Sequence, residues 1–153
     1  MNKKKLFYFL LVIIWMLIVF IFSNQPDIES SNTSSRFTEF IINVLVGNRV
    51  NIEEKAQLIK NFHPILRKFA HFSLYTIGGA LIFNYVNTYN INNKKKIAFS
   101  IGLGVFYAAL DEFHQIFISG RSGQISDVFI DSLGICVGVI ILFFIIKLNK
   151  KCT

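Results

Sequence analysis

Residues 97–118 read IAFSIGLGVFYAALDEFHQIFI, and residues 125–146 read ISDVFIDSLGICVGVIILFFII. A short polar turn, residues 119–124, separates these two apolar runs and has glycines at positions 120 and 123. A helix needs about 20 apolar residues to cross the hydrocarbon core of a bilayer. Glycine permits the backbone angles of a tight turn. This stretch therefore predicts an antiparallel hairpin of two membrane-spanning helices.

The rest of the chain has the same apolar character. Of its 153 residues, 53% are hydrophobic and 16% are charged, and the mean hydropathy is +0.51. This composition excludes an ordinary soluble domain, and the length fits one domain, residues 1–153. Two further apolar runs bring the number of expected spans to four. We predict an all-α integral membrane four-helix bundle with spans at about residues 6–22, 66–86, 97–118 and 125–147.

The basic residues predict the orientation. Lysines cluster at residues 3–5, 94–96 and 147–151, which all fall on one side of a four-span protein. By the positive-inside rule that side is the cytoplasm, so both termini are expected there. The first span has a longer apolar core than a signal peptide and a poor cleavage site at residues 23–26, which favours an uncleaved anchor. The net charge of +7 is then mainly a topology signal, and no nucleic-acid-binding motif accompanies it.

The segment between the first two spans is expected to lie outside the cell. Residues 23–35 are rich in Ser, Asn and Thr and predict an exposed loop after Pro26. Apolar residues with helical spacing then predict two short amphipathic helices, one around residues 37–45 and one at residues 53–62. These helices either lie on the outer membrane surface or cap the mouth of the bundle. Span two is expected to open at His63 and Pro64.

The polar residues of the last three spans fall at one depth, near their outer ends. Span by span they are Arg67, Lys68, His71 and Tyr75; Asp111, Glu112, His114 and Gln115; and Asp127 and Asp131. Helical spacing places Lys68, His71 and Tyr75 on one face. Ionisable residues in a membrane segment usually face a bundle interior or a water-filled cavity. We therefore predict a polar pocket open to the outside and roofed by the turn that carries Arg121.

These side chains suggest two kinds of chemistry. Three cations, Arg67, Lys68 and Arg121, suit an anionic headgroup or a phosphate. His71 and His114 suit proton exchange near neutral pH. A general acid or base could come from the carboxylates, Asp111, Glu112, Asp127 or Asp131. No spacing matches a defined metal motif, so we expect no metal and no cofactor.

Each polar residue also has a structural explanation. His71 and Tyr75 could hydrogen-bond across helices, Asp127 could cap span four, and Asp131 could pair with Arg67 or Lys68. As a group they favour a functional pocket, because burying many charges is a poor way to stabilise a fold. The Gly134-x-x-x-Gly138 motif fits close helix packing within the monomer or dimerisation, and we favour packing within the monomer.

Five short motifs together resemble the VanZ-like family. They are Phe22-Ser23-Asn24-Gln25-Pro26, Lys68-Phe69-Ala70-His71-Phe72 with Tyr75, Asp111-Glu112-Phe113-His114-Gln115, Gly120-Arg121, and Asp127 with Asp131-Ser132-Leu133-Gly134. The resemblance implies a bacterial plasma-membrane protein linked to the cell envelope. The family is best known for a member associated with low-level resistance to the glycopeptide teicoplanin. The resemblance also adds Ser23 and Gln25 to the candidate site.

Two functions from different classes follow. In the first, the pocket binds an anionic membrane lipid or a lipid-linked cell-wall precursor through Arg121, Lys68 and Arg67, and the remaining site residues contribute to binding. Those residues are Gln115, Tyr75, Asp127, Asp131, Ser23 and Gln25. In the second, the chain is an intramembrane hydrolase or transferase that acts on a phosphate-containing precursor. Asp111 or Glu112 would be its base, His114 or His71 its proton carrier, and Arg121 its anion clamp. The oligomeric state stays open.

Overall fold

The computed structural model describes residues 2–47, 50–121 and 123–149. These residues form five α-helices and contain no strand: α1 (Lys3–Ser23), α2 (Asp27–Val46), α3 (Ile52–Val86), α4 (Asn93–Gln115) and α5 (Ile125–Asn149). The all-α class predicted from the sequence is therefore confirmed. Two of the described helices, α1 and α5, are long and apolar enough to cross a membrane.

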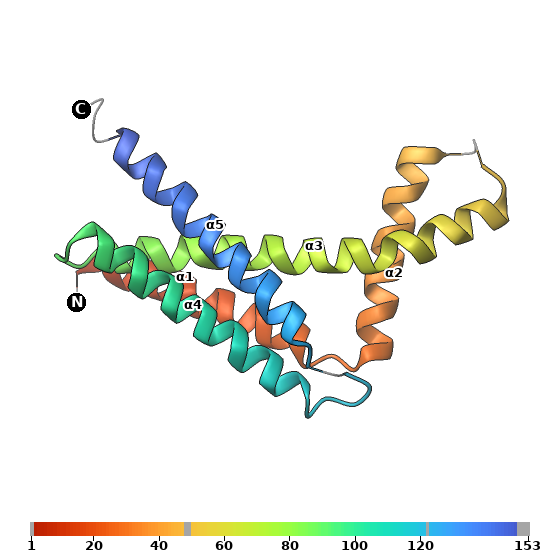
Figure 1. The fold of residues 1–153 in the computed structure, drawn as a ribbon, viewed down its shortest axis with the longest axis horizontal. Helices are drawn as coiled ribbons and strands as arrows, with labels where there is room; N and C mark the ends of the chain where they lie inside the picture. The colour runs from red at the N-terminus through yellow and green to blue at the C-terminus, as the bar shows by residue number, and fades with distance from the viewer. Residues whose placement is uncertain (1, 48–49, 122, 150–153) are drawn as a thin grey trace.

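Helix α3 is the axis of the molecule (Figure 1). Helix α5 crosses α3 in the most extensive helix–helix contact of the described chain, while α4 packs on both α3 and α5. Helix α1 lies along α3 and touches α4 only lightly. Helix α2 stands across the far end of α3 and contacts α3. This arrangement brings the polar middle of α3 together with the end of α4 and the start of α5.

The segment between α1 and α3 differs from the expectation. Residues 27–46 form one helix rather than a loop followed by a short helix, with Pro26 at the N-cap. The second short pattern, residues 53–62, is not a separate helix, because α3 runs unbroken from Ile52 and contains Pro64. Asn51 Oδ1 accepts a hydrogen bond from the Glu54 N–H at 2.8 Å, and Glu54 Oε2 accepts one from the Asn51 N–H at 3.2 Å. This capping box begins α3 well before the proline.

The third predicted span is shifted toward the N-terminus, because α4 begins at Asn93 rather than at Ile97. Helix α4 ends at Gln115 rather than at Ile118. The Phe117 and Ile118 N–H groups instead donate to the carbonyl oxygens of His114 and Gln115, at 3.0 and 3.1 Å. This tighter turn leads the chain into Gly120, which has φ = 80°. The polar ends of α4 and α5 therefore approach each other through a structured turn.

Close contacts along α3 hold the core together. A Cβ atom added at Gly138 would overlap the Thr76 carbonyl oxygen of α3, so this glycine lets α5 approach α3 closely. The Gly134-x-x-x-Gly138 motif therefore allows close helix packing within the monomer. On the other side of α3, Trp15 Nε1 donates to the Leu74 carbonyl oxygen at 3.0 Å and ties α1 to α3.

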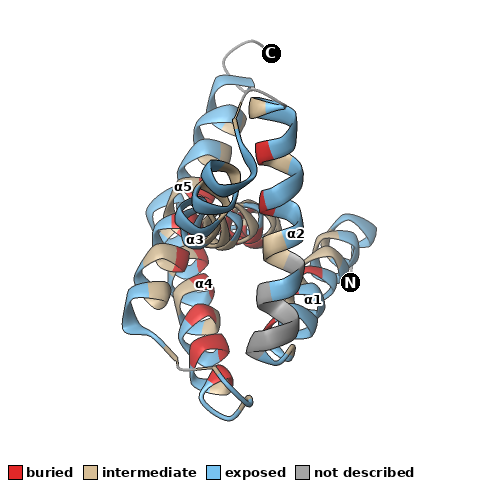
Figure 2. Cartoon of the chain, turned by 90° about the vertical axis from the view of Figure 1, so that its right-hand side faces the viewer, coloured by how far each residue is buried: buried red, intermediate tan, exposed pale blue. Residues whose placement is uncertain are grey.

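The outward faces of the helices remain apolar. In Figure 2 the buried residues lie on the faces that the helices turn toward one another, and most of the outer surface is exposed. That surface carries large apolar side chains such as Leu17, Phe106 and Phe144, each more than half exposed. An apolar surface of this extent needs an apolar environment to cover it. The pattern fits a protein surrounded by lipid.

The described helix ends that carry lysines lie on one side of the molecule. In Figure 1 the N-terminus and the α3–α4 connection lie next to each other, and α5 ends on the same side but apart from them. The Lys5 ammonium stands 3.7 Å from the centre of the Tyr89 ring, in the α3–α4 connection. The polar middle of α3, the end of α4 and the start of α5 lie away from this side.

Candidate functional site

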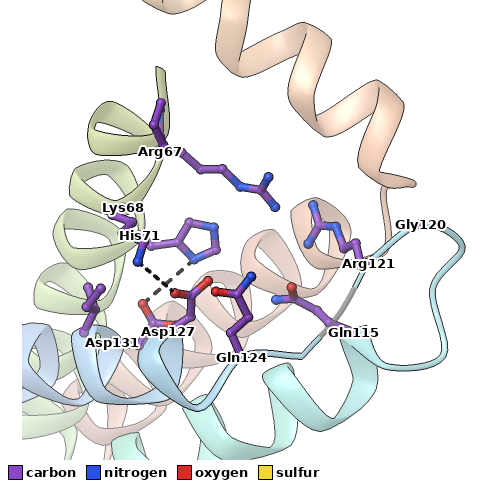
Figure 3. Close-up of a pocket in the computed structure, with 11 residues that line it drawn as sticks. Arg67, Lys68, His71, Gln115, Gly120, Arg121, Gln124, Asp127 and Asp131 are labelled. Atoms are coloured by element: carbon purple, nitrogen blue, oxygen red, sulfur yellow. Dashed lines mark ion pairs between the residues drawn. The ribbon is translucent and has the colours of Figure 1, made fainter. Parts of the chain in front are cut away.

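A polar cavity of about 300 Å³ lies where α3, α5 and the α4–α5 turn meet (Figure 3). Its lining residues are Pro64, Arg67, Lys68, His71, Gln115, Gly120, Arg121, Gln124, Asp127, Ile130 and Asp131. We call it the polar cavity. Helix α3 supplies the cations and the imidazole, α5 supplies two aspartates, and the turn supplies Arg121. Residues far apart in the sequence thus converge on one small volume.

Two oppositely charged pairs join α3 to the start of α5. Lys68 Nζ lies 3.8 Å from Asp127 Oδ1, and His71 Nδ1 lies 3.8 Å from Asp131 Oδ1. The Lys68 side chain is half exposed, whereas Asp131 is fully buried. Among the described residues neither Asp131 oxygen accepts a hydrogen bond. Since an unsatisfied buried polar group is costly, the His71–Asp131 pair is the part of the site most in need of a further partner.

Two arginines face each other across the polar cavity. Figure 3 shows the guanidinium groups of Arg67 and Arg121 pointing toward one another from α3 and from the turn. The turn holds Arg121 in place, because its N–H donates to the Ile118 carbonyl oxygen at 3.1 Å. Arg121 Nη2 also donates to the Phe22 carbonyl oxygen at the end of α1, at 3.2 Å. Two like charges held in this way create a position that favours an anion.

Asp111 is fixed by a buried hydrogen-bond network. Its Oδ2 accepts a hydrogen bond from the Tyr75 hydroxyl at 3.1 Å and another from Gln115 Nε2 at 3.2 Å. Tyr75 is fully buried, and Asp111 and Gln115 are each 5% exposed. This network joins α3 to α4 beneath the polar cavity.

A second cavity, of about 400 Å³, adjoins the first between α1, α2 and α3. Its lining residues are Val19, Phe22, Ser23, Gln25, Ser34, Phe37, Arg67, Ala70, His71, Leu74, Tyr75, Asp111 and Arg121. We call it the apolar cleft. Arg67, His71 and Arg121 line both cavities and form the boundary between them. The buried Ser23 hydroxyl in the apolar cleft has no hydrogen bond among the described residues.

The structure brings together every predicted site residue except Glu112 and His114. Glu112 lies beside the turn, where its Oε2 accepts a hydrogen bond from the Gln124 N–H at 3.0 Å. The His114 ring stacks on Phe20 of α1, with centroids 5.0 Å apart and planes 28° apart. Neither side chain lines the polar cavity or the apolar cleft.

Other lining residues were missed by the sequence reasoning. Gln124 lies in the same turn as Arg121, and that proximity was an available signal. Ser34 and Phe37 reach the apolar cleft only because α2 folds across the end of α3. The helical pattern around residues 37–45 had left open whether this segment caps the bundle or lies on the membrane surface, but it did not predict the crossing of α3.

The donor set favours anion binding over metal binding. Among the residues that the structure describes, no group of three or more His, Cys, Asp or Glu side chains is arranged to hold a metal ion. The polar cavity instead combines Arg67, Lys68 and Arg121 with the amides of Gln115 and Gln124. All of these groups can donate hydrogen bonds to phosphate or carboxylate oxygens.

Comparison with known proteins supports the motifs recognised in the sequence. The sequence model of the VanZ/LLP1 family matches residues 7–147, and the resemblance to this family is therefore confirmed. Neither the curated proteins nor the solved structures contain a match to this chain. The family match contains every residue that lines the two cavities, and this chain belongs to the VanZ/LLP1 family.

Proposed function

We propose that the chain is a multi-pass protein of the bacterial plasma membrane that binds an anionic lipid. In this proposal the polar cavity holds the headgroup of a membrane lipid or of a lipid-linked cell-envelope intermediate. The family match and the apolar helices α1 and α5 support the membrane location. The lipid-facing apolar surface supports it as well.

The convergence of three cations carries the proposal. Arg67, Lys68 and Arg121 line one cavity of about 300 Å³, and they come from α3 and from the turn that joins α4 to α5. Arginine offers a planar fork of donors that matches phosphate oxygens, and charge-assisted hydrogen bonds of this kind are strong. A headgroup phosphate can accept hydrogen bonds from all three of these side chains.

The distribution of lysines supports an outward-facing site. In a four-span topology the basic end of the molecule lies in the cytoplasm, together with both termini. The polar cavity lies toward the other end, at the level of the outer leaflet. An occupied site there would alter how a glycopeptide reaches lipid-linked cell-wall precursors. This links the proposal to the teicoplanin resistance with which the family is associated.

Lipid retention in native mass spectrometry tests this proposal. We expect Arg67→Gln and Arg121→Gln each to reduce the anionic lipid that co-purifies with the protein. Arg36→Gln is the matched control, because Arg36 is an exposed arginine of α2 that lines neither cavity. Equal retention by all three variants, each with an unchanged unfolding temperature, would exclude the polar cavity as the lipid site.

A catalytic function is the second candidate. The observation that favours it is the His71–Asp131 pair on the cavity wall, since a carboxylate beside an imidazole is a common arrangement for general acid–base chemistry. In that case the chain is an intramembrane hydrolase or transferase that acts on a phosphate-containing precursor. His71→Asn and Asp131→Asn should then abolish the change in teicoplanin susceptibility that the protein confers, while lipid retention persists. If these variants lose both lipid retention and the change in teicoplanin susceptibility, the result would favour a function in binding alone.

A further inference from the structure

We propose that the apolar cleft receives the hydrocarbon chain of the ligand whose phosphate occupies the polar cavity. The ligand class is then a lipid phosphate, a molecule that carries a phosphate at one end and an apolar chain at the other. This inference rests on the proposed binding function and adds the position of the chain. It also distinguishes a lipid from a free phosphate ion.

The shared boundary of the two cavities is the main reason. Arg67, His71 and Arg121 line both of them, so a phosphate bound between the arginines lies at the mouth of the apolar cleft. Any group attached to that phosphate must continue into one of the two volumes. The polar cavity is surrounded by charged and amide side chains, which disfavour an apolar chain.

The chemistry of the cleft suits a hydrocarbon. Its walls include Val19, Phe22, Phe37, Ala70 and Leu74, from three helices. Its volume of about 400 Å³ accommodates the first part of a long chain, and the remainder would continue into the surrounding bilayer. Apolar burial at a preformed cleft is favourable in proportion to the area removed from water.

A buried polar group marks the position of the link between phosphate and chain. Ser23 is 3% exposed and lines the apolar cleft, yet its hydroxyl has no hydrogen bond among the described residues. A hydroxyl here can donate to an ester or phosphate oxygen. Arg121 is anchored to the adjacent Phe22 carbonyl, so this hydroxyl and the arginine belong to the same corner of the site.

The test compares two probes on the full chain in nanodiscs of phosphatidylcholine. The probes are inorganic phosphate and dodecyl phosphate, which share the phosphate and differ in the chain. Binding can be followed by the fluorescence of Trp15, the single tryptophan, because its indole bonds to the Leu74 carbonyl beside the cleft. We expect dodecyl phosphate to bind at least about tenfold more tightly, because burial of its methylenes adds to the phosphate contacts.

A larger side chain in the apolar cleft distinguishes binding of the hydrocarbon chain from binding of the phosphate. Ala70→Phe should weaken dodecyl phosphate binding about tenfold and leave inorganic phosphate binding unchanged, because Ala70 lines the cleft and not the polar cavity. Ala109→Phe is the control, since Ala109 is an exposed α4 residue that lines neither cavity. Arg67→Gln should weaken both probes.

The outcomes distinguish the two proposals. Equal affinity for both probes, or an Ala70→Phe variant that binds dodecyl phosphate normally, overturns the chain-in-cleft inference while the headgroup proposal stands. Normal binding of both probes by Arg67→Gln and Arg121→Gln overturns the proposed function itself. Competition by phosphatidic acid against polyprenyl phosphate then identifies the source of the lipid phosphate, and failure of both to displace dodecyl phosphate also counts against the inference.

Discussion

Tyr75 of α3 donates its hydroxyl hydrogen to Oδ2 of Asp111 in α4 over 3.1 Å, and both side chains are buried. The same Asp111 oxygen accepts a second bond, from Gln115. A buried carboxylate with two donors has a fixed orientation, and its partners stabilise it against desolvation. The pair therefore sets the relative position of α3 and α4 directly below the polar cavity.

Removal of the Tyr75 hydroxyl should lower the free energy of unfolding of the protein. We expect Tyr75→Phe to lower stability by about 1–2 kcal/mol, because Asp111 loses one of two buried donors. Tyr89→Phe is the control, since Tyr89 bonds to Tyr85 at an exposed position and its loss should cost less than about 0.5 kcal/mol. Thermal unfolding in detergent measures both. Equal unfolding temperatures for the two variants would contradict a structural role for the buried bond.

The α3–α5 crossing should be intolerant of a single methyl group. We expect Gly138→Ala to destabilise by about 1–3 kcal/mol, because the added Cβ would overlap the Thr76 carbonyl oxygen. Gly102→Ala in α4 is the control, since its Cβ meets no atom within 4 Å. That change should stabilise slightly, by about 0.5–1 kcal/mol, because alanine favours helices. Thermal unfolding that shows the same sign for both variants would contradict the close-contact explanation.

Helical periodicity predicted which residues of α3 line the site, but not which of them face the polar cavity and which face the apolar cleft. Lys68, His71 and Tyr75 were placed on one face of a helix, and all three do line the site. Lys68 and Tyr75 are seven residues apart, however, so they differ by only about 20° around the helix axis but by about 10 Å along it. Tyr75 therefore meets α4 and the apolar cleft, while Lys68 lines the polar cavity. His114 is three residues after Asp111, which turns it by about 60° around the axis, and it meets Phe20 of α1.

Helix boundaries were predicted less well, for a local reason. Pro64 was expected to open a helix, yet α3 begins at Ile52 behind the capping box of Asn51 and Glu54. The capping signal was present in the sequence and outweighs the proline here. The position of α2 across α3 could not be predicted from local sequence patterns, because it depends on the packing of the two helices against each other.

Neutralising Asp127 should strengthen anion binding. Asp127 lines the polar cavity, and its Oδ1 lies 3.8 Å from Lys68 Nζ. Its negative charge therefore repels an incoming phosphate and competes with that phosphate for Lys68. We expect Asp127→Asn to raise the affinity for dodecyl phosphate a few-fold, equivalent to about 1 kcal/mol at a partly solvated site. Glu53→Gln is the control, since Glu53 is an exposed residue in the first turn of α3 that lines neither cavity, and it should leave the affinity unchanged. Weaker binding by Asp127→Asn would mean instead that the carboxylate itself contacts the ligand.

Glu112 should act through the turn that carries Arg121. Its Oε2 accepts the Gln124 N–H, so Glu112→Ala leaves that donor without its partner and loosens the turn. We expect this variant to lose about 1–3 kcal/mol of stability and to bind phosphate more weakly, because Arg121 is no longer held in place. Glu112→Gln keeps an acceptor at the same position and should retain both properties. Unfolding temperature and phosphate binding are measured on the two variants together. If Glu112→Gln binds phosphate normally but abolishes turnover of a lipid-phosphate substrate, the hydrolase or transferase function replaces simple binding.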